Sequence, residues 1–93
     1  MRILVTGHKG FVGKSVFEHL AKRHEVSGFD LKANPTMDIT DFDAVRMYME
    51  TYRPSLVLHL AAQAFIPVGE KDPKLDCSVN VLGTLNVLRV ALE

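Results

Sequence analysis

The sequence has little that would support a disulfide-bonded, membrane-spanning or nucleic-acid-binding protein. Cys77 is its single cysteine, which excludes an internal disulfide and is typical of a reducing, cytoplasmic compartment. Eleven basic and eleven acidic residues balance to a net charge of zero, so no excess positive charge is available for nucleic acid or an anionic membrane surface. The longest apolar region, residues 56–68, is broken by polar residues and a proline and is too short to span a bilayer. With 47% hydrophobic residues in 93 positions, the chain is expected to form one small soluble domain.

Near its N-terminus the chain carries the segment TGHKGFVG, between a short apolar run and an amphipathic stretch. Strand, glycine turn and helix in this order can hold the phosphates of a dinucleotide. Gly7 is expected to take the positive φ of the turn, Gly10 to let a pyrophosphate approach the backbone, and Gly13 to let the helix pack closely. The N–H groups of Phe11, Val12 and Gly13 would then point at the phosphates. The alternative is a plain glycine-rich turn, and the surrounding pattern favours the dinucleotide interpretation.

The pattern along the chain alternates strands and helices, which predicts an α/β fold. We expect a Rossmann-like three-layer α-β-α arrangement, with a partial doubly wound parallel sheet of about four strands in the order 3-2-1-4. Residues 1–93 would form the N-terminal half of an NAD(P)-binding Rossmann domain, without a second domain. Thr40 is the expected N-cap of the middle helix, and a loop holding Pro67, Gly69 and Pro73 is expected before the last helix. The predicted strands are 2–6, 25–30, the very short 37–39 and 55–60, and the predicted helices are 11–23, 41–52 and 75–93.

Two acidic residues follow the second predicted strand. Asp30 ends that strand, where a carboxylate can accept hydrogen bonds from both hydroxyls of an adenosine ribose and repel a 2′-phosphate. This favours NAD over NADP, although the nearby cations Lys9 and Lys32 could soften the preference. The alternative is an ordinary strand-end acid that caps a turn. Asp38 and Ile39 could border an adenine, or Asp38 could be a loop acid near the next helix.

Other polar residues are weaker candidates. His59, at the end of an apolar strand, is more simply interpreted as a hydrogen-bonded core histidine than as a catalytic one. Ala61 and Ala62 would leave room for a ligand at the end of this strand. Asn80 is expected to tether backbone or water. The remaining histidines show no spacing typical of metal ligands, so no metal site is predicted.

The last predicted helix is apolar on two sides. One stripe would cover the sheet, and the other would need a second protomer or a further C-terminal region. The chain stops at Glu93 inside this helix without a glycine cap, from which we expect a truncated or partial protein. One stripe consists of Val81, Leu85, Leu88 and Leu92, and the other of Val79, Gly83, Val87 and Val90.

Taken together, these residues resemble the N-terminal part of the extended short-chain dehydrogenase/reductase family, specifically its NAD-dependent nucleotide-sugar epimerases and dehydratases. The resemblance covers essentially the whole chain and rests on five motifs in order: TGHKGFVG, Asp30, the segment DITD at 38–41, HLAAQ at 59–63 and NVLGTLNVL at 80–88. It implies a homo-oligomer formed through the last helix. It also implies a cofactor-binding set: Gly7, Gly10, Phe11, Val12 and Gly13 at the pyrophosphate, Asp30 at the ribose, Asp38 and Ile39 at the adenine, Leu60, Ala61 and Ala62 toward the nicotinamide, and Asn80 as the family's helix asparagine.

The chain departs from this family in its catalytic residues. The family uses a Ser/Thr and a Tyr-x-x-x-Lys motif, but the residue four positions after Tyr48 is Tyr52, and four after Tyr52 is Leu56. No catalytic residue is therefore assigned, and whether the 93 residues act as an enzyme stays open. We expect the NAD-binding portion of a nucleotide-sugar epimerase/dehydratase-type oxidoreductase, inactive alone, with a nucleotide-sugar substrate only if the chain continues or assembles. The alternatives are a non-catalytic dinucleotide- or ADP-binding module and a remnant that acts through helix–helix assembly.

Overall fold

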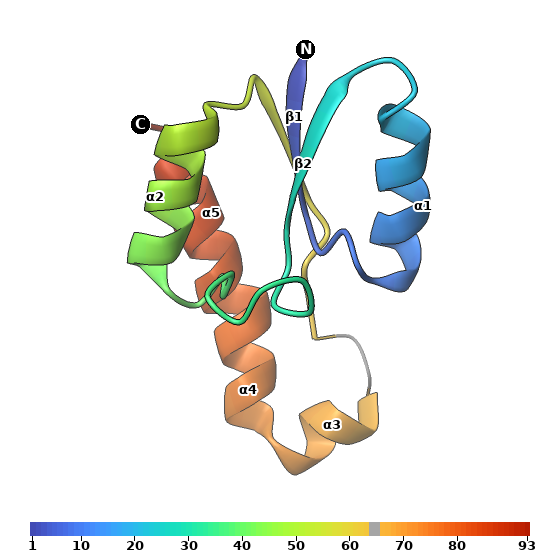
Figure 1. The fold of residues 1–93 in the computed structure, drawn as a ribbon. Coiled ribbons are helices and arrows are strands. Elements are labelled where there is room, and N and C mark those ends of the chain that lie inside the picture. The colour runs from blue at the N-terminus through green and yellow to red at the C-terminus, as the bar shows by residue number, and fades with distance from the viewer. Residues whose placement is uncertain (64–65) are drawn as a thin grey trace.

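A parallel sheet lies between two layers of helices in the computed structural model, which describes residues 1–63 and 66–93 (Figure 1). Helix α1 covers one face of the sheet, and α2 and α5 cover the other (Figure 1). The strands are β1 (Arg2–Thr6), β2 (Glu25–Phe29) and β3 (Leu56–His59). The helices are α1 (Phe11–Leu20), α2 (Phe42–Tyr52), α3 (Ile66–Lys71), α4 (Pro73–Cys77), the π-helical turn η1 (Ser78–Leu82) and α5 (Gly83–Ala91).

The sheet is built around β1, whose apolar sequence suits a strand buried on both faces. Both neighbours pair with β1 in parallel, in the order β2-β1-β3, so that Ile3 lies opposite Val26 on one side and Leu56 on the other. The main core lies between the sheet and the layer of α2 and α5. Its buried members are Leu4, Phe29, Ile39, Val45, Met49, Val87 and Val90.

The expected four-strand sheet is wrong for the part of the chain that is described. Residues 37–39 form no strand, so three strands remain. Their order, β2-β1-β3, is the predicted order 3-2-1-4 without its third strand, because β3 is the strand expected at 55–60. The reason is local hydrogen bonding. Asp38 Oδ1 accepts from both the backbone N–H and the hydroxyl of Thr40, which closes a turn where a strand would have to extend.

The same turn moves the start of α2. Because the Thr40 hydroxyl donates to Asp38, Thr40 is not the helix cap that the sequence predicted. Asp41 is the N-cap, and its Oδ1 accepts from the Ala44 N–H at 3.2 Å. Val12, in the first turn of α1, has an exposed side chain.

The loop expected between β3 and the last helix contains two short helices. Pro67 occupies the first turn of α3 and Pro73 that of α4, where a missing N–H breaks no helical hydrogen bond. Asp72 caps α4 by accepting from the Leu75 N–H at 3.1 Å. The chain then continues through η1 into α5, so the predicted last helix exists but contains a π-helical turn.

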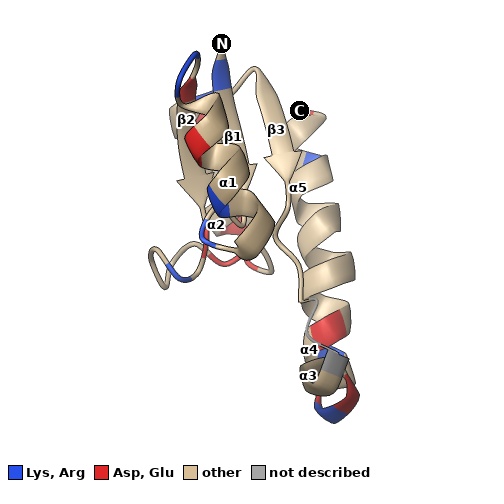
Figure 2. Cartoon of the chain, turned by 90° about the vertical axis from the view of Figure 1, so that its right-hand side faces the viewer, with Lys and Arg blue, Asp and Glu red and all other residues tan. Residues whose placement is uncertain are grey.

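The two apolar stripes of the last helix separate as the sequence predicted. Gly83, Val87 and Val90 are buried against the rest of the chain. The opposite stripe is exposed, with 50% of Leu85 and 54% of Leu88 accessible. Figure 2 shows how little charge this part of the chain carries, and Arg89 is the only charged residue within α5. None of the helices described in the structure is long and apolar enough to cross a membrane.

Candidate functional site

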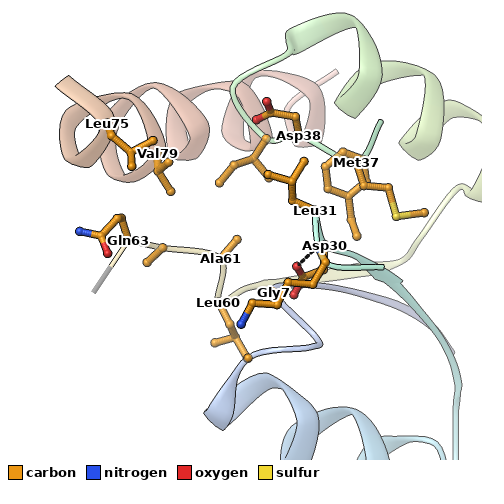
Figure 3. Close-up of a pocket in the computed structure, with 15 residues that line it drawn as sticks. Gly7, Asp30, Leu31, Met37, Asp38, Leu60, Ala61, Gln63, Leu75 and Val79 are labelled. Atoms are coloured by element: carbon orange, nitrogen blue, oxygen red, sulfur yellow. Dashed lines mark hydrogen bonds between the residues drawn. The ribbon is translucent and has the colours of Figure 1, made fainter. Parts of the chain in front are cut away.

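A pocket of about 470 Å³ opens where the three strands end (Figure 3). In open α/β sheets this carboxyl edge is where ligands bind. Figure 3 shows Leu75 and Val79 on one wall, facing the segment that carries Leu60, Ala61 and Gln63. The lining residues are Gly7, Gly10, Phe29, Asp30, Leu31, Lys32, Met37, Asp38, Ile39, Leu60, Ala61, Ala62, Gln63, Leu75 and Val79.

The glycine turn has the geometry that the sequence predicted. Gly7 has a φ of 75°, and a Cβ there would lie 2.7 Å from the backbone nitrogen of Ala61. At Gly13 a Cβ would lie 1.9 Å from the Gly7 carbonyl oxygen, so the helix can approach the turn this closely only without a side chain. Gly10 is the N-cap of α1, and because it has no side chain, it cannot cap the N–H groups of the first turn. That turn contains no acidic residue, so nothing negative competes there with an anionic ligand.

Asp30 lies on the pocket wall with its carboxylate fixed by two backbone groups. Its Oδ2 accepts from the Lys9 N–H and its Oδ1 from the Lys32 N–H, both at 2.9 Å. The alternative role considered from the sequence, an acid that caps a turn, is therefore present in the structure. It leaves room for ligand binding, because an ionised carboxylate has about four acceptor positions. The Asp30 carboxylate is thus both oriented and able to accept from further donors.

Asp38 and Ile39 form the opposite part of the wall, each with a structural task of its own. Asp38 holds the Thr40 turn, while the Ile39 side chain is buried against Gly83. The Ile39 carbonyl accepts from Asn86 Nδ2 at 2.8 Å. Asn86 is 2% exposed, and the sequence reasoning missed it.

Asn80 acts as the tether that its position in the sequence predicted. Its Oδ1 accepts from the Gln63 N–H at 2.7 Å, and its Nδ2 donates to the Gln63 carbonyl at 2.9 Å and to Asp76 Oδ1 at 3.2 Å. This pair of backbone contacts fixes the chain directly after residues 60–62 to the last helix. Asn80 therefore supports the wall of the pocket and does not line it.

Two histidines lie beneath the site. His59 is half-buried and hydrogen-bonded on both ring nitrogens, to Thr6 Oγ1 at 2.6 Å and to Thr84 Oγ1 at 3.0 Å, as expected of a hydrogen-bonded structural histidine. The ring of His8 packs where a side chain on Gly28 would have to be, and its centroid lies 5.2 Å from that of Phe17. Burial lowers the pKa of both rings, and for His8 the nearby Asp30 opposes this effect.

The structure brings most of the residues expected from the sequence into one pocket. Phe11, Val12, Gly13 and Asn80 lie outside the lining, the first three in the helical turn that follows Gly10. We did not predict from the sequence that Leu75 and Val79 line the pocket, although the pattern of apolar residues gave a signal for this. Leu75 and Val79 continue the buried stripe of α5 backward by helical spacing, beyond the end of the sheet. Among residues 1–63 and 66–93, no group of histidine, cysteine and acidic side chains is arranged to hold a metal ion.

Comparison with known proteins gives a consistent family. Residues 3–93 match the NAD dependent epimerase/dehydratase family. The chain is 38% identical over its whole length to GDP-6-deoxy-D-talose 4-dehydrogenase of Aggregatibacter actinomycetemcomitans and covers 31% of that protein. It is 32% identical to UDP-glucose 4-epimerase of Mycolicibacterium smegmatis, with 98% of the chain aligned to 34% of that protein. The chain thus spans about a third of the length of these curated relatives.

Solved structures show the same fold. The UDP-glucose 4-epimerase of Thermus thermophilus, in complex with NAD, matches with a TM-score of 0.88 at 38% identity. That match covers 98% of this chain and 33% of the epimerase. A dTDP-4-dehydrorhamnose reductase of Bacillus anthracis, in complex with NADP, matches with a TM-score of 0.87 at 30% identity, over 97% of this chain and 31% of the reductase. These matches confirm the Rossmann-like α/β fold.

Proposed function

The chain belongs to the NAD-dependent epimerase/dehydratase family, and we propose that it forms the adenosine- and pyrophosphate-binding part of a nicotinamide dinucleotide site. The observation that carries this proposal is the pocket itself, where the glycine turn, Asp30 and residues 60–62 meet at the carboxyl edge of the sheet. Gly7, Gly10 and the first turn of α1, with Phe11, Val12 and Gly13, would hold the pyrophosphate. Asp38 and Ile39 would border the adenine, and Leu60, Ala61 and Ala62 would lie toward the nicotinamide.

Asp30 supports NAD as the cofactor over NADP. Because Lys9 and Lys32 hold its carboxylate at the end of β2, the carboxylate can accept from ribose hydroxyls and would repel a 2′-phosphate. The related structures contain NAD in one case and NADP in another, so the family alone does not decide between them. The Lys32 side chain also lines the pocket and would reduce this preference without reversing it.

Calorimetric titration of the 93-residue chain with NAD, ADP-ribose and NADP tests this function. We expect saturable binding of NAD and ADP-ribose, and binding of NADP weaker by about tenfold or more. Asp30→Asn removes the charge, and losing a charge-assisted hydrogen bond of about 1.5–3 kcal/mol would weaken NAD binding roughly 10- to 100-fold. Asp41→Asn is the matched control, because Asp41 lies outside this pocket and asparagine also caps helices. A folded chain that binds none of the three ligands would contradict the proposal.

The reaction of the whole protein is proposed from the family. NAD supplies hydride transfer when it is bound, and the residues of this chain bind and orient it. The 93 residues contain no Tyr-x-x-x-Lys sequence, so we expect no turnover of a nucleotide sugar by this chain alone. Epimerisation or dehydration of such a sugar would need catalytic residues from outside it. The competing candidate, a non-catalytic dinucleotide- or ADP-binding module, shares the same pocket. A catalytic motif in any longer form of the protein would decide against it.

We also propose a homo-oligomer formed through the last helix, in a cytoplasmic protein. The support is the exposed stripe of Val81, Leu85, Leu88 and Leu92. Sedimentation over a range of concentrations tests it. Leu88→Glu should shift the chain toward monomer, whereas Met47→Glu, a change at an exposed apolar residue of α2, should not. A chain that is monomeric at every concentration would contradict self-association.

A further inference from the structure

A continuous series of hydrogen bonds runs beneath the pocket from β1 to the last helix. The Thr6 hydroxyl oxygen lies 3.1 Å from the Leu60 backbone nitrogen, 3.2 Å from that of Ala61 and 2.6 Å from His59 Nδ1. The other ring nitrogen, Nε2, lies 3.0 Å from Thr84 Oγ1. The Thr84 hydroxyl in turn donates to the Asn80 carbonyl at 2.7 Å.

The direction of each hydrogen bond follows from the chemistry of the Thr6 hydroxyl. A hydroxyl has one hydrogen to donate and two lone pairs. Thr6 Oγ1 accepts the Ala61 N–H and also the Leu60 N–H, which is shared with the Thr6 carbonyl oxygen at 3.1 Å, so the Thr6 hydrogen points at His59 Nδ1. Nδ1 must therefore be unprotonated, and the ring proton lies on Nε2, which donates to Thr84. Only neutral His59 in this tautomer satisfies every group in the series.

The segments joined in this way all adjoin the pocket. Thr6 is the residue before Gly7, and a Cβ on Gly7 would lie 2.7 Å from the Ala61 nitrogen, so the glycine turn and residues 60–61 are already in close contact (Figure 3). At the other end, Asn80 holds the Gln63 backbone by both its N–H and its carbonyl. The series therefore fixes residues 60–63 between the glycine turn and the last helix.

We propose that His59, neutral and protonated on Nε2, is a positioning residue of the dinucleotide site, and that its protonation displaces residues 60–62 and weakens cofactor binding. The part that concerns the cofactor rests on the function proposed above. A proton added to Nδ1 would face a hydroxyl whose lone pairs are already occupied. Thr6, which is 2% exposed, would then have to release the Ala61 N–H, or release the Leu60 N–H to the Thr6 carbonyl alone, and its own hydrogen would lose the Nδ1 acceptor.

The surroundings of His59 do not stabilise a positive charge. Arg2 is the charged residue of β1 and lies at the strand's opposite end, and Arg89 of α5 is placed over the Phe42 ring. The Asp76 carboxylate accepts from Asn80 and Gln63. Burial is the only cause that lowers the pKa of His59, in keeping with a ring that stays neutral in the folded chain.

Nuclear magnetic resonance on the unsubstituted chain tests the arrangement without any cofactor. The ¹⁵N shifts of the His59 ring should identify the Nε2–H tautomer near pH 7.5, and the ring should titrate below pH 6.5. The backbone amide signals of Gly7, Leu60 and Ala61 should move with the same midpoint. An Nδ1–H tautomer, a midpoint at or above 6.5, or amide signals that do not follow the ring would each overturn the inference.

NAD titrations across the same pH range test the consequence for binding. If only neutral His59 permits binding, the dissociation constant should rise about tenfold for each pH unit below the pKa of His59 in the free chain. Both titrations are made with His8→Gln present, because burial also lowers the pKa of His8 beside the glycine turn. His59→Asn keeps an acceptor for Thr6 but cannot titrate, so this pH dependence should disappear, while His19→Gln, an exposed site, should retain it. A pH dependence that persists in His59→Asn would overturn the inference. A folded chain that binds no NAD at any pH would instead contradict the proposed function. In that case the amide titration alone would test whether His59 positions residues 60–62.

Discussion

Replacing Gly13 by alanine should loosen α1 from the glycine turn. The added Cβ would lie 1.9 Å from the Gly7 carbonyl oxygen, 2.8 Å from the Gly7 carbonyl carbon and 3.0 Å from His8 Cα. All three are backbone atoms, so no flexible side chain can move away. The turn or the first turn of the helix must shift, and both belong to the proposed pyrophosphate site.

The expected change combines two opposing terms. Alanine is better than glycine in a helix interior by about 1 kcal/mol. Overpacking typically costs about 1–3 kcal/mol, and contact with rigid backbone places Gly13→Ala near the upper end, so about 2 kcal/mol of net destabilisation remains. For a domain of this size, that corresponds to a fall in Tm of roughly 8–16 °C.

Gly83→Ala is the matched control for this prediction. Gly83 is also a buried helical glycine, but its Cβ would meet side-chain atoms of the buried Ile39, Cδ1 at 2.6 Å and Cγ1 at 2.7 Å, and no backbone atom. The Ile39 side chain can change its rotamer where the backbone at Gly7 cannot, and we expect a smaller loss of stability than for Gly13→Ala. Urea denaturation followed by circular dichroism measures both variants against the unsubstituted chain. If Gly13→Ala matched the unsubstituted chain, or Gly83→Ala lost more, the close approach of α1 to the turn would be refuted.

Three further predictions concern the interior and the helix caps. Burial lowers the folded-state pKa of His8 and His59 below 6.5, so the unfolded chain binds more protons as the medium is acidified. The free energy of unfolding should therefore hold steady above pH 6.5 and fall below it, for His59 by at most about 1.4 kcal/mol per pH unit until the folded-state pKa is passed; urea midpoints that rise on acidification would contradict this. Asn86→Ala removes a buried donor and should cost about 1–3 kcal/mol in the same assay, and a neutral effect would argue against its hydrogen bond. Asp41→Ala should cost about 1 kcal/mol, whereas Thr40→Ala should cost less, and the reverse order would restore the helix cap expected from the sequence.

Much of the site could be predicted from the sequence because its signals are local. The positive φ of Gly7, the close contact at Gly13 and the position of Asp30 at a strand end all depend on a few neighbouring residues. The tether made by Asn80 could also be predicted, since a polar amide in an apolar helix needs hydrogen-bond partners. These features follow from chain geometry that the spacing of glycines and apolar residues already determines.

The predictions that were wrong concern places where alternative hydrogen bonds compete, and residue type alone does not decide which of them forms. Residues 37–39 were expected to form a very short strand, but Asp38 forms a turn with Thr40, and this also moves the helix cap to Asp41. Asn86 was missed because its partner, the Ile39 carbonyl, is distant in sequence. The apolar pocket wall required knowing how far the last helix extends past the end of the sheet.

The central claim is that the pocket at the carboxyl edge of β1, β2 and β3 is the binding site for the adenosine and pyrophosphate of NAD. Titration of ¹⁵N-labelled chain with ADP-ribose, followed by the backbone amide signals, tests it most directly. The largest shifts should fall at Gly7, Gly10, Asp30 and residues 60–62, and they should saturate with a single dissociation constant. A folded chain whose shifts are absent, or that lie instead around Arg2 and Arg53 at the opposite end of the sheet, would contradict it.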